Sequence, residues 1–221
     1  MTDYEEVWER FESERRLEFG GHRDPDWQGG HALSASLMVP VDVSRFRERL
    51  APVRDDLRTL PYVSLHPDHF MHITLLLLGF LVPEPGSGNE VSSERLREIE
   101  ERSREALEDF PSFSVELANL NAFPGAAFIE AHDDGKLEEL RDFLCDRCGL
   151  QRPRGPSHLT LAYFQAPDGT TAPEDLVSTI GRYRQWPVGE LEVDRVELTL
   201  LDVQSEFPTP ETLTEVRLDP G

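Results

Sequence analysis

The same short phrase occurs twice in this chain, and it constrains the possible fold more than any other feature. His72-Ile73-Thr74-Leu75 and His158-Leu159-Thr160-Leu161 begin 86 residues apart, each within an apolar run of strand length. Side chains alternate between the two faces of a strand, so the His and Thr of each copy point to one face while the intervening residue points into the core. The repeat predicts two related halves whose histidines and threonines face one another across a cleft.

The pattern around each copy predicts a chain in which helices and strands are mixed. Apolar spacing and turn residues indicate helices over residues 3–19, 43–57, 93–107, 133–148 and 174–183, and strands over residues 32–39, 71–80, 113–120, 126–131, 157–164, 191–201 and 212–218. Ser92 is expected to cap the third helix and Gly149 to end the fourth. Closely spaced strands favour antiparallel pairing, so we expect an α+β fold, with a helical appendage at residues 1–30 and a two-lobed domain at residues 31–221.

The charge of the chain excludes a broad nucleic-acid-coating surface. There are 22 Lys+Arg against 43 Asp+Glu, a net charge of -21, which repels a long polyanion.

Two cysteines, Cys145 and Cys148, are too few for a disulfide scaffold or a zinc site and are expected to pack in a helix. An acidic N-terminus and the lack of a long apolar run predict a cytoplasmic monomer without a membrane partner.

The two His-x-Thr pairs suggest acid–base chemistry on a phosphate diester. Near neutral pH one imidazole can take a proton from attacking water while a second, protonated imidazole gives a proton to the leaving oxygen. Threonine hydroxyls can hydrogen-bond the non-bridging phosphate oxygens as charge develops on them. We therefore predict His72, Thr74, His158 and Thr160 as the catalytic residues, with no metal and no cofactor.

With these motifs the chain resembles the 2H phosphoesterase superfamily, especially its RNA 2',3'-cyclic phosphodiesterase or 2'-5' RNA ligase-like branch. The resemblance runs from about His31 to Leu218 and includes Asn121-Ala122-Phe123-Pro124, which is similar to the strand-turn between the family's two motifs. It implies a bilobal, pseudo-two-fold fold of two antiparallel sheets flanked by helices. It also implies metal-independent opening of 2',3'-cyclic phosphates at RNA ends or on small nucleotides.

The substrate-binding residues are less clearly marked. Members of the RNA-end branch often carry a basic residue five positions after the second histidine, where this chain has Tyr163, so a cyclic mononucleotide or ADP-ribose cyclic phosphate stays an alternative substrate. Arg152 and Arg154, just before the second motif, are candidates for the missing positive charge. Phe123 and Tyr163 are candidates for stacking on a base.

Three rival interpretations are weaker. His66, His69 and His72 have a spacing that would converge on a helix face as a metal site, but Pro67 and the apolar strand that follows argue against a helix there. An ATP-dependent ligase needs a nucleophilic lysine, and Lys136 is expected at the exposed start of a helix. A non-catalytic module that binds a nucleotide or an RNA end is the third alternative, and the intact motifs argue against it.

Overall fold

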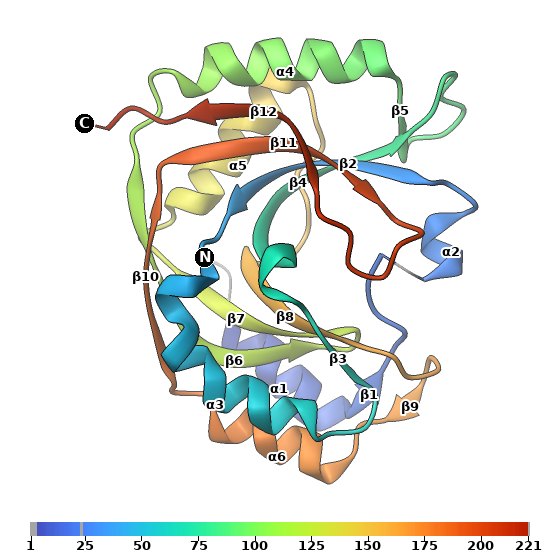
Figure 1. Cartoon of the computed structure of the whole chain (residues 1–221), viewed down its shortest axis with the longest axis vertical. Coiled ribbons are helices and arrows are strands. Elements are labelled where there is room, and N and C mark those ends of the chain that lie inside the picture. Colours follow the sequence, from blue (N-terminus) through green and yellow to red (C-terminus); the bar gives the residue numbers. More distant parts are fainter. Residues whose placement is uncertain (1–3, 23, 221) are drawn as a thin grey trace.

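Ten strands hydrogen-bond into one main sheet in the computed structural model, which describes residues 4–22 and 24–220 (Figure 1). They are β2 (Leu33–Pro40), β3 (Val63–Leu65), β4 (His72–Leu81), β5 (Glu90–Val91), β6 (Phe113–Phe123), β7 (Ala126–His132), β8 (His158–Phe164), β10 (Pro187–Val193), β11 (Arg195–Asp202) and β12 (Glu211–Arg217). A separate small sheet pairs β1 (Arg16–Leu17) with β9 (Thr170–Thr171). Short helical turns lie at α2 (Pro25–Gln28), η1 (Val43–Phe46) and η2 (Asp68–Phe70).

The main sheet consists of two antiparallel halves. One half has the strand order β10-β6-β7-β8 and the other β4-β2-β11-β12, while β3 pairs with β8 and β5 runs parallel to β4. The halves meet where Ile73 of β4 lies opposite Leu159 of β8. The α+β, two-lobed expectation is thus confirmed, with the two predicted sheets joined edge to edge into one.

The helices are exchanged between the lobes. α4 (Ser93–Leu107) and α5 (Lys136–Cys148) pack on each other and on the half that holds β4, whereas α1 (Tyr4–Glu14), α3 (Arg47–Arg58) and α6 (Glu174–Arg182) cover the half that holds β8 (Figure 1). In the chain, α3 lies between β2 and β4 but packs against β3 and β10. Likewise α5 lies between β7 and β8 but contacts β4. Each lobe therefore contributes a helix to the core of the other.

Two predicted helix ends are confirmed, whereas the helix predicted over residues 3–19 is shorter: α1 ends at Glu14, Arg15 has φ 47°, and Arg16–Leu17 form β1. The Ser92 hydroxyl accepts a hydrogen bond from the Arg95 backbone N–H at 3.1 Å, which satisfies one of the unpaired donors in the first turn of α4. Gly149 ends α5 with φ 62°, a left-handed conformation that glycine adopts without a Cβ penalty. Cys145 and Cys148 are both free and buried on the inner face of α5, as expected.

One predicted strand is wrong. Residues 191–201 are predicted as a single strand, but β10 and β11 are separated at Asp194 and lie in different halves of the sheet. Leu191 and Val193 keep one phase of the alternation, and the next buried residue, Val196, is three positions further on. That slip from a period of two marks the point where the chain crosses from one lobe to the other. The short strands β1, β3, β5 and β9 were not predicted.

The N-terminal segment contributes to the main core. Trp8 and Phe11 of α1, together with Leu17 of β1, are buried in the same apolar cluster as the central strands. Tyr4 contacts two further segments. Its hydroxyl oxygen lies 2.8 Å from the carbonyl oxygen of Ala131 and 2.6 Å from that of Ser157, and its single proton is donated to one of them. A domain division at residue 30 stays a prediction. Among the described residues, no helix is both long and apolar enough to cross a membrane.

Candidate active site at the junction of the two lobes

The two His-x-Thr motifs lie on neighbouring strands at the junction of the sheet halves. Ile73 and Leu159, the central residues of the motifs, face each other across the β4–β8 pair and are fully buried. Because side chains alternate along each strand, the flanking His and Thr side chains point to the opposite, partly exposed face. The antiparallel pairing places each histidine near the threonine of the other motif. The strand register therefore brings the four residues to one face of the sheet, and their convergence on a common ligand stays a prediction.

Both imidazoles are oriented by the same backbone contact. The Nδ1 atom of His72 lies 2.9 Å from the carbonyl oxygen of Phe70, and Nδ1 of His158 lies 2.8 Å from that of Pro156. A carbonyl only accepts hydrogen bonds, so Nδ1 must carry the proton in each neutral ring. Nε2 is then the nitrogen left to exchange a proton with a substrate, in both motifs alike.

Burial makes both histidines weak bases. It lowers the pKa of His72 to about 4, and the nearby rings of His158 and His22 add to the effect, while the Phe70 carbonyl opposes it. Burial also lowers the pKa of His158, with a smaller contribution from Arg141 and an opposing one from the Pro156 carbonyl. The effect of His158 on the pKa of His72 agrees with the placement of the two motifs on paired strands.

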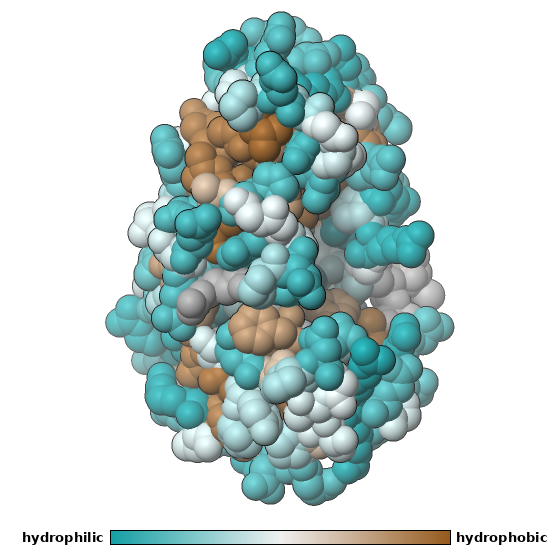
Figure 2. All heavy atoms as spheres, turned by 90° about the vertical axis from the view of Figure 1, so that its right-hand side faces the viewer, coloured by the Kyte–Doolittle hydropathy of each residue, from teal (hydrophilic) through white to brown (hydrophobic). Residues whose placement is uncertain are grey.

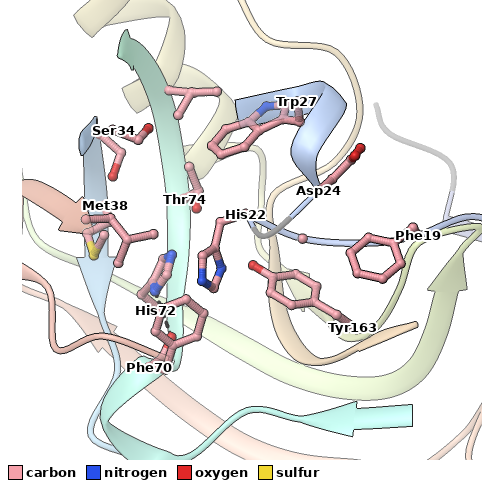
Figure 3. Close-up of a pocket in the computed structure, with 14 residues that line it drawn as sticks. Phe19, His22, Asp24, Trp27, Ser34, Met38, Phe70, His72, Thr74 and Tyr163 are labelled. Atoms are coloured by element: carbon pink, nitrogen blue, oxygen red, sulfur yellow. Dashed lines mark hydrogen bonds between the residues drawn. The ribbon is translucent and has the colours of Figure 1, made fainter. Parts of the chain in front are cut away.

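A cavity of about 380 Å³ opens beside the first motif (Figure 3). One wall is formed by β4 and β2, where Met38 pairs with Thr74 and the small side chains of Ser34 and Ser36 leave room. His72 lies at one end of this wall. His158 and Thr160 are on the adjoining strand, beyond the residues that line this cavity.

Two of the predicted substrate-binding residues pack against histidines, Tyr163 against His66 and Phe123 against His158. Tyr163 lines the cavity, and its ring packs edge-on against His66 with centroids 4.3 Å apart. Phe123 stacks on Phe128 at 4.3 Å, and its ring lies 5.1 Å from the imidazole of His158. Both rings therefore pack against imidazoles, and their contact with a base stays a prediction.

The two predicted arginines lie elsewhere. Arg152 forms ion pairs with Glu138 (2.9 Å) and Asp142 (3.0 Å) and borders a different cavity, with Tyr4 and Ser157. Arg154 is an exposed loop residue. Since the carboxylates of α5 already hold Arg152, a role for it in substrate binding would require those ion pairs to break.

His66 and His69, which flank Pro67 and precede the first motif, have different surroundings. His66 is buried in an aromatic surrounding, and burial lowers its pKa to about 3, with His72 and His22 adding to the effect. The Nε2 atom of His69 contacts the carbonyl of Phe207 at 2.9 Å. Across residues 4–22 and 24–220, no group of three or more His, Cys, Asp or Glu side chains is arranged to hold a metal ion.

Arg141 is a residue of this junction that the sequence analysis missed. It is buried on α5, where Nε donates to the carbonyl of Leu75 on β4 at 3.0 Å and Nη1 donates to that of Gly155, before β8, at 3.0 Å. It also pairs with Glu138 at 2.8 Å. A signal was available, because Arg141 occupies a position on the apolar face of α5, next to Leu140, where a charged residue needs a buried partner.

Comparison with known proteins agrees with this geometry. A sequence model of the 2'-5' RNA ligase superfamily matches residues 42–204. The chain belongs to the 2'-5' RNA ligase superfamily. Its resemblance to the 2H phosphoesterases is thereby confirmed, and with it a phosphoesterase family.

One curated relative and several solved structures are also similar to this chain. An RNA 2',3'-cyclic phosphodiesterase of Archaeoglobus fulgidus is 28% identical over 167 residues, 71% of this chain and 85% of the relative. TT0787 of Thermus thermophilus shares the fold, with a TM-score of 0.60, 19% identity, and coverage of 85% of this chain and 98% of that one. E. coli LigT, solved with 3'-AMP, has a TM-score of 0.57 and 17% identity, with the same two coverages.

Proposed function

We propose that this protein is a metal-independent cyclic phosphodiesterase that opens 2',3'-cyclic phosphates by paired histidine catalysis. The observation that carries the proposal is the symmetric placement of His72 and His158 across the Ile73–Leu159 pair, each with Nδ1 fixed by a carbonyl two residues earlier. Two identically oriented imidazoles can supply both proton transfers that the reaction needs. The name of the Archaeoglobus relative supports the choice of a cyclic phosphate as substrate.

The proposed reaction uses the two imidazoles in opposite protonation states. Nε2 of a neutral histidine removes a proton from water as the water oxygen bonds to phosphorus. The bond from phosphorus to one ribose oxygen then breaks, and that oxygen takes a proton from Nε2–H of the other histidine. The product is an open phosphate monoester, and the two histidines have exchanged protonation states. The order in which His72 and His158 serve as base and acid depends on which ribose oxygen leaves.

The threonines and the substrate itself complete this mechanism. The hydroxyls of Thr74 and Thr160 lie on the same face as the imidazoles, where they can donate to the non-bridging oxygens as negative charge develops. Burial lowers the pKa of both histidines. A bound phosphate anion raises the pKa of the histidine that it contacts, so substrate binding promotes formation of the protonated acid.

The test is hydrolysis of 2',3'-cyclic AMP, and of a short RNA that ends in a 2',3'-cyclic phosphate, in the presence of EDTA. We expect wild-type turnover, with kcat reduced by about 10² to 10⁴-fold in His72→Ala and in His158→Ala. His132→Ala, which removes a half-exposed imidazole outside the cavity, is the matched control. Turnover that needs added zinc, or that survives in either motif variant, contradicts the mechanism. Nucleotide binding without turnover would identify a binding module instead.

A further inference from the structure

One side chain of α3, Arg54, contacts the turn before the first motif at three places. Its Nη2 donates to the carbonyl of His66 at 2.9 Å, and its Nη1 donates to the carboxylate of Asp68 at 2.9 Å. Nη1 also lies 3.9 Å from the sulfur of Met71, which directly precedes His72. The guanidinium group therefore contacts the turn at its start, in its middle and at its end.

This turn carries the carbonyl that orients His72. The short helix η2 closes through a hydrogen bond from the backbone N–H of Phe70 to the carbonyl of Pro67 at 3.0 Å. The carbonyl of Phe70 then lies 2.9 Å from Nδ1 of His72, the contact drawn as a dashed line in Figure 3. A shift of the turn would move this carbonyl and change the direction in which Nε2 of His72 points, and small misplacements of a catalytic group slow a reaction strongly.

Arg141 has the corresponding position before the second motif. Arg54 precedes His72 by 18 residues and Arg141 precedes His158 by 17, each on the last α-helix before its motif strand. Arg141 donates to the carbonyl of Gly155, in the turn before β8, at 3.0 Å. The two arginines thus follow the same repeat as the two motifs.

Each arginine is also connected to the strand of the other motif. Nε of Arg141 donates to the carbonyl of Leu75 on β4 at 3.0 Å. Arg54 is connected to β8 through the backbone of His66, because the N–H of His66 donates to the carbonyl of Leu161 at 2.8 Å. Leu75 and Leu161 follow the threonines of the two motifs and are equivalent residues in the repeat. Each turn is therefore fixed relative to both motif strands.

The helices that carry these arginines cover the opposite lobes. α3 covers the half of the sheet that holds β8, although Arg54 contacts the turn before β4, and α5 packs on the half that holds β4, although Arg141 contacts the turn before β8 (Figure 1). On the side where α2 lies, Figure 2 shows a hollow between the upper part of the molecule, which holds β4, and the lower part, which holds β8. The turn before each motif is thus attached to the lobe of the other motif.

Both guanidinium groups are largely buried, which strengthens these contacts. The side chains of Arg54 and Arg141 are 16% and 6% exposed, so little water competes for their hydrogen bonds. Hydrogen bonds from a charged donor are stronger than those between neutral groups, and a low local dielectric strengthens them further. Arg58 on the same helix as Arg54 differs, because it is exposed and pairs with Asp55 of α3 itself.

On the basis of the proposed function, we infer that Arg54 and Arg141 are a matched pair of positioning residues. Arg54 fixes the carbonyl that holds the Nδ1–H tautomer and the direction of His72, and Arg141 does the same for His158 through the turn before β8. Because each arginine lies on a helix that covers the lobe of the other histidine, the directions of both imidazoles depend on how the two lobes fit together.

The kinetic test measures kcat and KM for 2',3'-cyclic AMP in Arg54→Met. We expect kcat to fall about tenfold while KM changes by less than about twofold, because a misdirected imidazole slows proton transfer more than it weakens binding. Arg54→Lys keeps a positive charge beside Asp68, but its single ammonium group cannot replace the guanidinium fork, so kcat should stay reduced. Arg54→Lys serves in both tests if Arg54→Met does not fold, as judged by thermal unfolding. Arg58→Met is the matched control and should leave kcat and KM unchanged.

Nitrogen NMR of isotopically labelled histidine gives a readout that does not depend on turnover. At about pH 8 both rings are neutral, because burial lowers the pKa of His72 and His158 below 6.5, and the two ring nitrogens then report which of them carries the proton. The signals are assigned by their loss in His72→Ala and His158→Ala. We expect Arg54→Met to mix the tautomers of His72 alone, and Arg141→Met to mix those of His158 alone.

The outcomes separate this inference from the proposed function. Unchanged His72 signals in Arg54→Met, whatever the change in kcat, would show that Arg54 only stabilises the turn. If Arg54→Met and Arg141→Met each disturb both histidines equally, the paired assignment is wrong. If the wild type hydrolyses no cyclic phosphate, the proposed function fails, and the NMR comparison still decides whether the two arginines orient the two histidines.

Discussion

Replacing Arg141 with methionine tests whether the junction between the lobes depends on one buried side chain. Methionine keeps a flexible apolar side chain but removes the guanidinium group. The carbonyl of Leu75 then loses its donor in a fully buried place, which costs about 2 kcal/mol. Gly155 is exposed, so water can replace the lost donor there, and Glu138 retains its ion pair with Arg152. With up to about 1 kcal/mol for the partly exposed Arg141–Glu138 pair, we expect about 3 kcal/mol of destabilisation.

The assay is urea unfolding together with steady-state kinetics. Gly155 directly precedes Pro156, whose carbonyl orients His158, so Arg141→Met should also lower kcat by about tenfold with little change in KM. Arg147→Met, on the exposed face of the same helix, is the control and should change stability by less than about 0.5 kcal/mol. A loss of stability no larger than that of the control would refute the estimate. An unchanged kcat would show that Arg141 holds the lobes together without positioning the histidine.

Three further predictions concern the histidines and threonines of the site. Thr74→Val and Thr160→Val should each lower kcat by about tenfold, less than the loss in His72→Ala or His158→Ala, and an equal loss would assign the threonines a larger role. Burial lowers the pKa of both His72 and His158 from 6.5, so the population with one neutral and one protonated imidazole is largest below that pH. A plot of kcat/KM against pH should therefore be bell-shaped with its maximum below pH 6.5. A maximum above pH 7.5 would contradict the lowered pKa values. Folding lowers the pKa of His66 from 6.5 to about 3, so between these pH values the unfolded chain binds a proton that the folded chain does not. The free energy of unfolding therefore falls as the pH drops through this range, by up to about 1.4 kcal/mol per pH unit. His66→Phe should weaken this dependence in urea unfolding at pH 7 and pH 5, and an identical pH dependence in the variant would refute the assignment.

The part of the site that repeats in sequence could be predicted, because a repeat on two strands leaves few arrangements. Alternation assigns Ile73 and Leu159 to the buried face, and two related halves can bring their histidines together only where the two strands meet. The strand pairing and the face of each His and Thr side chain follow from that argument. The identical carbonyl contacts of His72 and His158 do not, since they depend on the turn that precedes each strand.

The surroundings of the motifs could not be predicted equally well, because they depend on contacts between distant segments. Arg152 is close to His158 in sequence, but the carboxylates of α5 bind it beside a different cavity from the one that His72 lines. His22 is far from both motifs in sequence, and no local pattern indicates that it lies in the cavity beside His72. The crossing at Asp194 was missed although the slip in alternation was visible, since a slip also occurs at a β-bulge within one strand.

The exchange of helices between the lobes has a consequence for how the chain folds. The strand β2 pairs with β11, and α3 packs against β10, so neither half of the sheet is complete until residues near the C-terminus have been made. Contacts between such distant segments slow folding, because a long loop must close before they stabilise anything. During synthesis β4, which carries the first His-x-Thr motif, therefore lacks its full set of partner strands until the later strands have been made. Neither lobe is expected to fold when expressed alone, and a chain that stops after β8 should be degraded rather than weakly active.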